Sequence, residues 1–191
     1  MKDDRTELAD LIEKYAISYS KEPFTLASGV KSHFYFDLRQ VSGDAAGIAA
    51  IARIMYKMIL EIGGIKSIGG LESGSISIAA AISQQSYIKD PKCTLSSFYV
   101  RKKVKSHGAK KRIEGRPQTL VAIVDDVITS GNSAIEALDA VKSAGYDSKC
   151  LLSIVYRGNK EQKAKIKEYG KFLYIFDEKY FLDRYLKNHK L

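Results

Sequence analysis

The sequence lacks the features expected of a membrane, secreted or metal-binding protein. No apolar run approaches the roughly 18 residues that a membrane span needs, and the charged N-terminal segment has no signal-peptide core. Cys93 and Cys150 lie in or beside apolar runs, where buried thiols are expected rather than a disulfide. With three scattered histidines they show no metal-ligand spacing. We therefore expect a cytoplasmic protein with no membrane partner.

Length and composition predict one globular domain, because 191 residues can bury a sizeable core and show no repeat, low-complexity stretch or linker. Hydrophobic residues make up 45% of the chain and charged residues 28%, which is ordinary for a globular protein. The net charge of +9 fits either nucleic acid or a small polyanionic substrate. Charge alone leaves both partners open, so its placement along the chain has to separate them.

Helical and strand patterns alternate along most of the chain. Apolar spacing predicts an amphipathic helix over 7–19, followed by two short strands between Phe24 and Arg39 around a turn at Ser28-Gly29. Further helices are expected at 44–62, 75–85, 133–144, 161–169 and 179–187, and strands at 65–71, 95–101, 119–124, 149–156 and 172–176. The alternation predicts an α/β fold with a central, mostly parallel sheet flanked by helices. Ligands of such sheets bind beyond the C-terminal ends of the strands.

The most informative segment is Val121-Ala-Ile-Val-Asp-Asp-Val-Ile-Thr-Ser-Gly-Asn-Ser133. A buried strand delivers Asp125 and Asp126 to a turn of small residues that opens a helix. The exposed N–H groups and the dipole of that helix favour a phosphate monoester. The two carboxylates suit ribose hydroxyls, or a sugar with developing positive charge. The segment therefore predicts a site for a ribose 5-phosphate, and it is not a P-loop because Gly-x-x-x-x-Gly-Lys-Ser/Thr is missing.

Residues 101–116 form a strongly basic segment, in which eight residues are Lys or Arg and Glu114 is the single acid. Mutual repulsion is expected to keep such a loop open until a pyrophosphate draws it closed over the reacting centre, with Gly108 and Gly115 as flexible points. The loop has no interleaved aromatic residues for stacking on bases, so nucleic acid is not the expected partner. A solvated basic loop without a ligand is the alternative.

Two of these motifs resemble known enzymes. Residues 121–133 resemble the phosphoribosyl pyrophosphate signature of type I phosphoribosyltransferases, and Arg101-Lys102-x-x-Lys105-x-His107-Gly108 resembles the catalytic loop of orotate phosphoribosyltransferases. The likeness covers most of residues 22–158. It implies the type I phosphoribosyltransferase fold in a single domain of residues 1–191. The core would be about 41–158, the mobile catalytic loop 101–116, and a small hood would combine about 1–40 with the C-terminal segment.

The resemblance also implies the roles of individual residues. The implied catalytic residues are Lys105, His107, Asp125 and Asp126. The implied phosphoribosyl pyrophosphate site adds the pyrophosphate loop Gly70–Gly74 and consists of Arg101, Lys102, Lys105, His107, Glu72, Ser73, Gly74, Asp125, Asp126, Val127, Ile128, Thr129, Ser130, Gly131, Asn132 and Ser133. The implied orotate site consists of Tyr35, Phe36, Thr129 and Arg157. Alternation along a strand sends Tyr35 and Phe36 to opposite faces, so one of the two is a candidate core residue.

The activity implied by the resemblance is Mg²⁺-dependent transfer of ribose 5-phosphate from phosphoribosyl pyrophosphate to orotate. The products would be orotidine 5′-monophosphate and pyrophosphate, in de novo pyrimidine (UMP) biosynthesis. No side chain is expected to hold Mg²⁺ on its own, since substrate and water supply most of its ligands. The resemblance further implies a homodimer in which the catalytic loop reaches the partner's active site. The alternatives are the same chemistry on uracil or a purine, and a regulator that binds phosphoribosyl pyrophosphate and RNA or DNA.

The chain departs from the family pattern where cations are usual. Ala27 stands where many members carry lysine, and Glu72-Ser73 stands where many bacterial members carry Tyr-Lys. His33 replaces a common proline. Lys31 and Lys102 are the candidates for replacing the lost positive charge.

Overall fold

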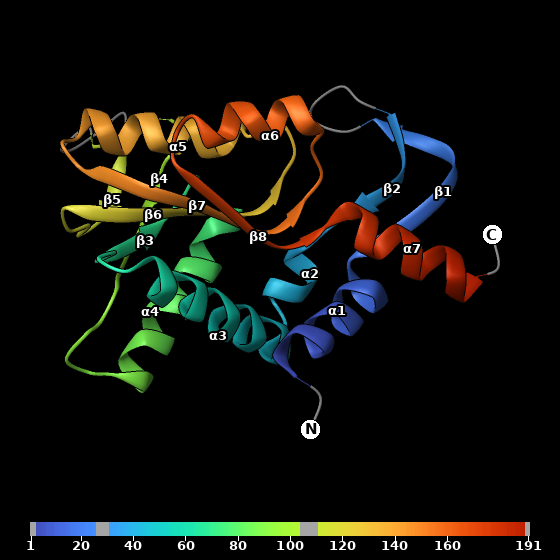
Figure 1. The fold of residues 1–191 in the computed structure, drawn as a ribbon, viewed down its shortest axis with the longest axis horizontal. Helices are drawn as coiled ribbons and strands as arrows, with labels where there is room; N and C mark the ends of the chain where they lie inside the picture. Colours follow the sequence, from blue (N-terminus) through green and yellow to red (C-terminus); the bar gives the residue numbers. More distant parts are fainter. Residues whose placement is uncertain (1–2, 26–30, 104–110, 190–191) are drawn as a thin grey trace.

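The computed structural model describes residues 3–25, 31–103 and 111–189, which form two β-sheets and seven helices (Figure 1). In chain order the elements are α1 (Asp4–Tyr15), β1 (Ile17–Thr25), β2 (Lys31–Phe36), α2 (Arg39–Ser42), α3 (Ala45–Ile62), β3 (Ser67–Gly69), α4 (Gly74–Lys89), β4 (Ser96–Val100), β5 (Ile113–Gly115), β6 (Leu120–Ile128), α5 (Asn132–Ser143), β7 (Asp147–Tyr156), α6 (Lys160–Lys167), β8 (Lys171–Asp177) and α7 (Glu178–His189).

The larger sheet has six strands in the order β5-β4-β3-β6-β7-β8. Every neighbouring pair is parallel except β4 with β5. From β3 the chain moves outward to the β5 edge, and from β6 it moves outward to the β8 edge. The direction of winding therefore reverses between β3 and β6, which is where an open α/β sheet binds its ligands. The prediction of a mostly parallel central sheet is confirmed.

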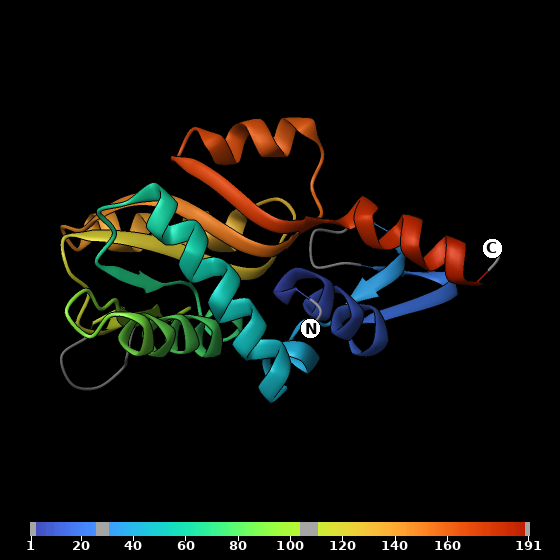
Figure 2. The same cartoon turned by 60° about the horizontal axis from the view of Figure 1, so that its bottom comes forward.

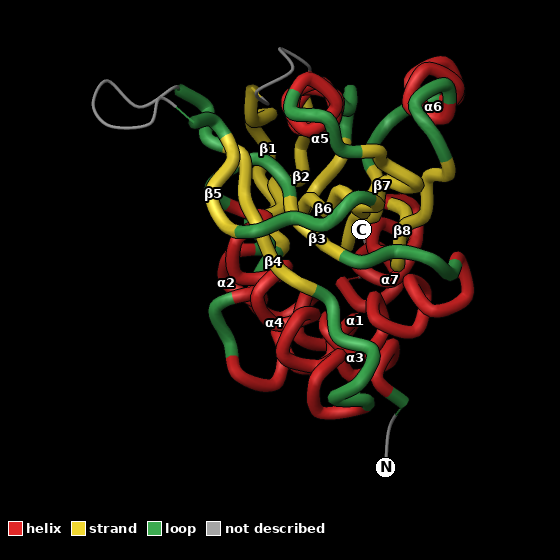
Figure 3. The backbone as a smooth tube through the Cα atoms, turned by 90° about the vertical axis from the view of Figure 1, so that its left-hand side faces the viewer, coloured by secondary structure: helices red, strands yellow, loops and turns green. Residues whose placement is uncertain are grey.

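Helices cover both faces of this sheet, which makes it the middle layer of three. Helices α1, α3 and α4 lie on one face, and α5 and α6 lie on the other (Figure 3). Strand β6 serves both cores: Ala122 and Val124 belong to the cluster with α3 and α4, whereas Val121 and Ile123 belong to the cluster with α5. A strand that is buried on both faces needs apolar residues at successive positions, which explains the continuous apolar run in the sequence.

Helix α1, the β1–β2 ribbon and α7 lie together at one end of the molecule (Figure 2), and we call this group of elements the hood. The N-terminal helix was expected over 7–19 but ends at Tyr15, and Tyr19 lies in β1. Pairing with β2, in which Ile17 lies opposite Phe36, draws residues 17–19 into an antiparallel ribbon. Local apolar spacing could not reveal this competing partner.

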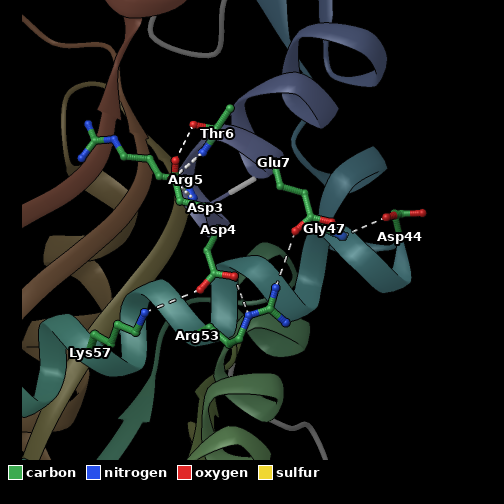
Figure 4. Close-up of polar contacts among 9 residues, drawn as sticks. All are labelled: Asp3, Asp4, Arg5, Thr6, Glu7, Asp44, Gly47, Arg53 and Lys57. Atoms are coloured by element: carbon green, nitrogen blue, oxygen red, sulfur yellow. Dashed lines mark hydrogen bonds and ion pairs between the residues drawn. The ribbon is translucent and has the colours of Figure 1, made fainter. Parts of the chain in front are cut away.

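Polar contacts fasten α1 to its neighbours. Arg53 of α3 donates through Nε to Asp4 Oδ1 over 2.8 Å, with Glu7 and Lys57 nearby in the same network (Figure 4). At the other end of the chain, Arg184 of α7 binds two acidic residues of α1, with nitrogen–oxygen distances of 2.7 and 2.8 Å. These contacts hold the two ends of the chain together over the core.

Several elements differ from the pattern expected from the sequence. Helix α2 and strand β5 were not predicted, and β5 occupies residues within the expected mobile loop. Strand β6 continues to Ile128, because Asp125 and Val127 keep pairing with β7 residues Ser153 and Val155. The acid pair therefore lies within the end of the strand rather than after it. None of the described helices combines the length and the apolar character that crossing a membrane requires.

We expect Phe181→Ala to lower the free energy of unfolding by about 3–5 kcal/mol, the usual cost of emptying a buried aromatic site. Phe181 is fully buried in α7 and packs against the rings of Phe36 and Phe176. Leu186→Ala on the same helix is the control, because Leu186 is 42% exposed and its loss should change stability by less than about 1 kcal/mol. Urea unfolding followed by circular dichroism measures both, and equal effects would contradict this account of the hood.

Candidate active site

A cleft opens at the junction of β3 and β6 and consists of two adjoining pockets. The first, which we call the turn pocket, has a volume of about 320 Å³ and follows the β6–α5 turn and Arg157. The second, the acidic pocket, has a volume of about 370 Å³ and lies against the β3–α4 loop. The lining residues that the two share are Tyr35, Phe36, Asp125, Val127 and Ser133. A ligand with groups at both ends can therefore occupy one continuous space.

The turn pocket presents an uncapped helix N-terminus. Helix α5 begins at Asn132, and its N-cap residue, Gly131, has no side chain that could accept hydrogen bonds from the first turn. The first N–H groups of the helix therefore remain available to an anion. Gly131 has φ of 83°, and a Cβ at this position would lie 2.6 Å from Cγ1 of Ile166. The left-handed backbone and the close contact both exclude a side chain at this position, so glycine is required. The predicted run from Val127 to Ser133 lines the pocket as a group.

Of the two carboxylates, Asp125 lines both pockets and Asp126 lines the acidic pocket. Asp125 accepts a hydrogen bond from the backbone of Asp126, and Asp126 accepts one from the backbone of Val127. Gly74 approaches Asp126 so closely that a Cβ there would lie 3.0 Å from its carboxyl carbon. Burial raises the pKa of Asp125 well above its ordinary value, and the negative charge of Asp126 raises it further. A neighbouring positive charge or hydroxyl donor would relieve this cost.

Arg157 is held rigidly beside the turn pocket. Its side chain is 5% exposed, and its Nη2 donates to Glu178 Oε1 over 2.6 Å and to Ser32 Oγ and the Phe34 carbonyl over 3.2 Å. Nε also donates to Glu178 over 3.0 Å. Among the described residues these bonds use one side of the guanidinium, which leaves Nη1 for a ligand in the pocket. The arginine is thus placed to receive a carboxylate.

The two aromatic candidates have different environments. Phe36 is buried, packs against Phe181, and lies under the guanidinium of Arg157, which is 4.6 Å from the ring centroid. Tyr35 is 39% exposed and borders both pockets. Phe36 is therefore the core residue of the pair, although its edge still lines the cleft. Tyr35 offers the ring face that a flat ligand can contact.

The basic segment contributes unequally to the cleft. Lys102 lines the acidic pocket, and its backbone N–H donates to Glu72 Oε1 over 2.9 Å, which ties the segment to the β3–α4 loop. Arg101 lines neither pocket, since its Nη1 lies 3.8 Å from Glu114 on β5. Lys105 and His107 lie outside the described residues. Lys31, one candidate for the missing charge, also lines neither pocket.

Comparisons with known proteins identify the chain. No family model matches it. The orotate phosphoribosyltransferase of Rhodopseudomonas palustris (strain BisB18) is 41% identical over 159 residues, which are 80% of this chain and 82% of that protein. Its counterpart from strain BisB5 is 37% identical over 186 residues, 94% of this chain and 97% of that protein. The chain belongs to the orotate phosphoribosyltransferase family.

Solved structures agree with this family membership. The orotate phosphoribosyltransferase of Mycobacterium tuberculosis H37Rv, in complex with Fe(III) dicitrate, superposes with a TM-score of 0.77 at 30% identity, covering 93% of this chain and 98% of that one. The same enzyme in complex with 5-phospho-alpha-D-ribosyl 1-diphosphate gives a TM-score of 0.72 at 28% identity, with the same coverage. The predicted type I phosphoribosyltransferase fold is confirmed, and the chain is a phosphoribosyltransferase enzyme.

The sequence motifs did not identify three residues that line the cleft or contact Arg157. Asp37 and Arg39 line the acidic pocket, and Glu178 pairs with Arg157. Asp37 and Arg39 directly follow the aromatic pair at the end of β2, which was the available signal. Glu178 carried no signal, because it begins α7 and its partner Arg157 follows β7, 21 residues earlier in the chain.

We expect Asp125→Asn to stabilise the ligand-free protein near neutral pH. The pKa of Asp125 in the folded protein is raised above the ordinary value of 3.8. The carboxyl therefore contributes its full stability below pH 3.8, and this contribution is lost as the pH rises through the pKa of the folded protein. Asparagine does not ionise, so the variant keeps this stability at neutral pH. Urea unfolding at about pH 7 and about pH 4 should show a gain that shrinks in acid. Asp147→Asn, at an exposed position opening β7, is the control, and an Asp125→Asn protein less stable than wild type at neutral pH would contradict the assignment.

Proposed function

We propose that this protein is an orotate phosphoribosyltransferase that joins orotate to the ribose 5-phosphate of phosphoribosyl pyrophosphate. The products are orotidine 5′-monophosphate and pyrophosphate, a step of de novo UMP synthesis. The observation that carries the proposal is one cleft that combines an uncapped helix N-terminus, an acid pair and a buried arginine. These three features match a phosphate, a ribose and a carboxylated base in that order.

The reaction needs no nucleophilic side chain. The orotate ring nitrogen bonds to C1 of the ribose as the bond from C1 to the diphosphate oxygen breaks, with inversion at that carbon, and the proton of that ring nitrogen is released to solvent. The protein supplies position and charge stabilisation. The turn at Thr129–Ser133 holds the 5-phosphate, and Asp125 and Asp126 accept from the ribose hydroxyls. Positive charge that develops on the sugar then lies beside two carboxylates, one of which burial has left costly to ionise in the free protein.

Orotate binds between Tyr35 and Arg157 in this proposal. The Arg157 guanidinium receives the carboxylate that uracil and the purine bases lack, and the exposed ring of Tyr35 covers the flat pyrimidine. The diphosphate lies in the acidic pocket against Ser73 and Gly74, where α4 begins without a side-chain cap.

The residues present fit a Mg²⁺ that is held mainly by substrate. Among the described residues no group of three or more His, Cys, Asp or Glu side chains could hold a metal ion. Asp126 borders the pyrophosphate loop, however, and one or two carboxylates together with substrate phosphates are the usual ligands of this ion. Bound there, Mg²⁺ would neutralise charge on the departing diphosphate.

A homodimer is the proposed catalytic unit. The proposal rests on the likeness of residues 101–108 to the family's catalytic loop, which implies that Lys105 and His107 act in the partner's active site. The cytoplasmic location stays a prediction of the sequence.

The test is the loss of orotate absorbance when protein, phosphoribosyl pyrophosphate and Mg²⁺ are mixed. Consumption that requires all three supports the proposal. A panel with uracil, adenine, guanine and hypoxanthine in place of orotate measures base choice. Turnover of one of these bases without turnover of orotate would overturn the assignment.

We expect Arg157→Lys to raise the KM for orotate by about 10- to 100-fold, which is the value of one or two hydrogen bonds between charged groups. Lysine keeps a positive charge but cannot bridge Glu178 and a ligand carboxylate with one planar group. Initial rates at varied orotate and saturating phosphoribosyl pyrophosphate measure the effect. An unchanged KM for orotate would remove Arg157 from the base site.

We expect Lys105→Ala to lower kcat by about 10²–10³-fold, because a lost charge-stabilising donor acts mainly in the transition state. Lys103→Ala is the control, since Lys103 has no assigned role. Mixing inactive Lys105→Ala subunits with inactive Asp125→Asn subunits should restore part of the activity, because one active site of each heterodimer then has both residues. Failure of dissociated and reassembled mixtures to recover activity would argue against a shared site.

A further inference from the structure

A second basic side chain lines the acidic pocket beside Lys102. Arg39 is the first residue of α2, its side chain is 62% exposed, and it shares the pocket with Ser73 and Gly74 at the start of α4. We propose that Arg39 binds the diphosphate of phosphoribosyl pyrophosphate and supplies the positive charge that Ser73 does not. The inference rests on the proposed function, because it assigns a residue to the same cleft.

The main chain around Arg39 is fixed by its neighbours. Leu38 is 1% exposed and Val41 is fully buried, so both sides of the short helix α2 are anchored in the core. The N–H of Asp37 donates to the Ala16 carbonyl over 2.8 Å, which ties the same segment to the end of α1. The side chain of Arg39 is the part that remains free to follow a ligand.

Acidic side chains outnumber basic ones around the acidic pocket, so a diphosphate bound there needs the positive charge of Arg39. The described lining residues of the pocket carry two positive side chains, Arg39 and Lys102, against four carboxylates: Asp37, Glu72, Asp125 and Asp126. A diphosphate adds further negative charge to that surplus. Since Arg101 is turned towards Glu114 and Ser73 is neutral, the described cations that can face the diphosphate are Lys102 and Arg39.

The geometry of Arg39 suits a phosphate. Its Nε donates to Asp37 Oδ1 over 2.7 Å, and this hydrogen bond lowers the pKa of Asp37 and keeps it ionised. Among the described contacts the two terminal nitrogens are not engaged, so they can bind two phosphate oxygens in parallel. Asp37 thereby acts as a positioning residue. An exposed ion pair of this kind contributes little to stability, so a small reorientation towards a ligand costs little.

The test measures pyrophosphate binding in the presence of Mg²⁺ by isothermal titration calorimetry. Arg39→Ala should weaken binding by about 10- to 100-fold, as expected for one or two charge-assisted hydrogen bonds. Arg39→Lys should recover part of the loss through its charge alone. In steady-state assays the KM for phosphoribosyl pyrophosphate should rise with Arg39→Ala, whereas the KM for orotate should stay within about twofold, since Arg39 does not line the turn pocket.

Arg53→Ala is the matched control. Arg53 also donates through Nε to an aspartate, Asp4, over 2.8 Å, but the pair lies between α3 and α1 and outside both pockets of the cleft (Figure 4). A rescue variant separates charge from structure: Ser73→Lys in the Arg39→Ala background places a cation across the same pocket and should restore pyrophosphate binding. A purely structural role for Arg39 would give no rescue.

The outcomes separate this inference from the proposed function. A wild-type protein that consumes orotate, with an Arg39→Ala variant that binds pyrophosphate as tightly as Arg53→Ala does, would overturn the role of Arg39 alone. A wild-type protein that binds pyrophosphate through Arg39 but never consumes orotate would overturn the choice of base and leave the role of Arg39 standing.

Discussion

Strand β3 pairs in parallel with β6 through Ser67, Ile68 and Gly69, and this pairing forces two distant loops into one cleft. The chain winds away from the pair in both directions, so no strand lies between the loops that follow them. The β3–α4 loop and the C-terminal end of β6 consequently line the same pocket. Gly74, the first residue of α4, lies so close to Asp126 of β6 that an added Cβ would be 3.0 Å from the carboxyl carbon.

This closeness creates an electrostatic problem that the rest of the cleft resolves. In the proposed function the pockets accept a polyanion although they also present a carboxylate pair to the sugar. The negative charge is offset by dipoles and cations on separate elements: the uncapped N-termini of α4 and α5, Lys102 at the end of β4, and Arg39 at the start of α2. In the proposed function each ligand group thus meets its own partner, and Asp125 and Asp126 face the ribose.

The parts of the site that follow one another in sequence could be predicted, because their physics is local. A buried strand, two acids, a turn of small residues and a helix start are adjacent between Val121 and Ser133, and the structure places them as one unit. The end of α1 and the extent of β1 could not be predicted, since they depend on pairing with β2. The same reason applies to β5, which is three residues long and forms by antiparallel pairing with β4.

The surroundings of Arg157 could not be predicted either, because they depend on contacts between side chains that are distant in the sequence. The role of Arg157 was implied by the family resemblance, but its surroundings come from two other elements: Ser32, Phe34 and Phe36 on β2, and Glu178 on α7.

Since α7 is itself fastened to α1 through Arg184, the base pocket is complete only when both ends of the chain have docked on the sheet. The phosphate turn, by contrast, needs only β6, α5 and their immediate neighbours. In the proposed function the phosphoribosyl group therefore contacts the core, whereas the base contacts Tyr35 of β2 and Arg157, which is held by Glu178 of α7.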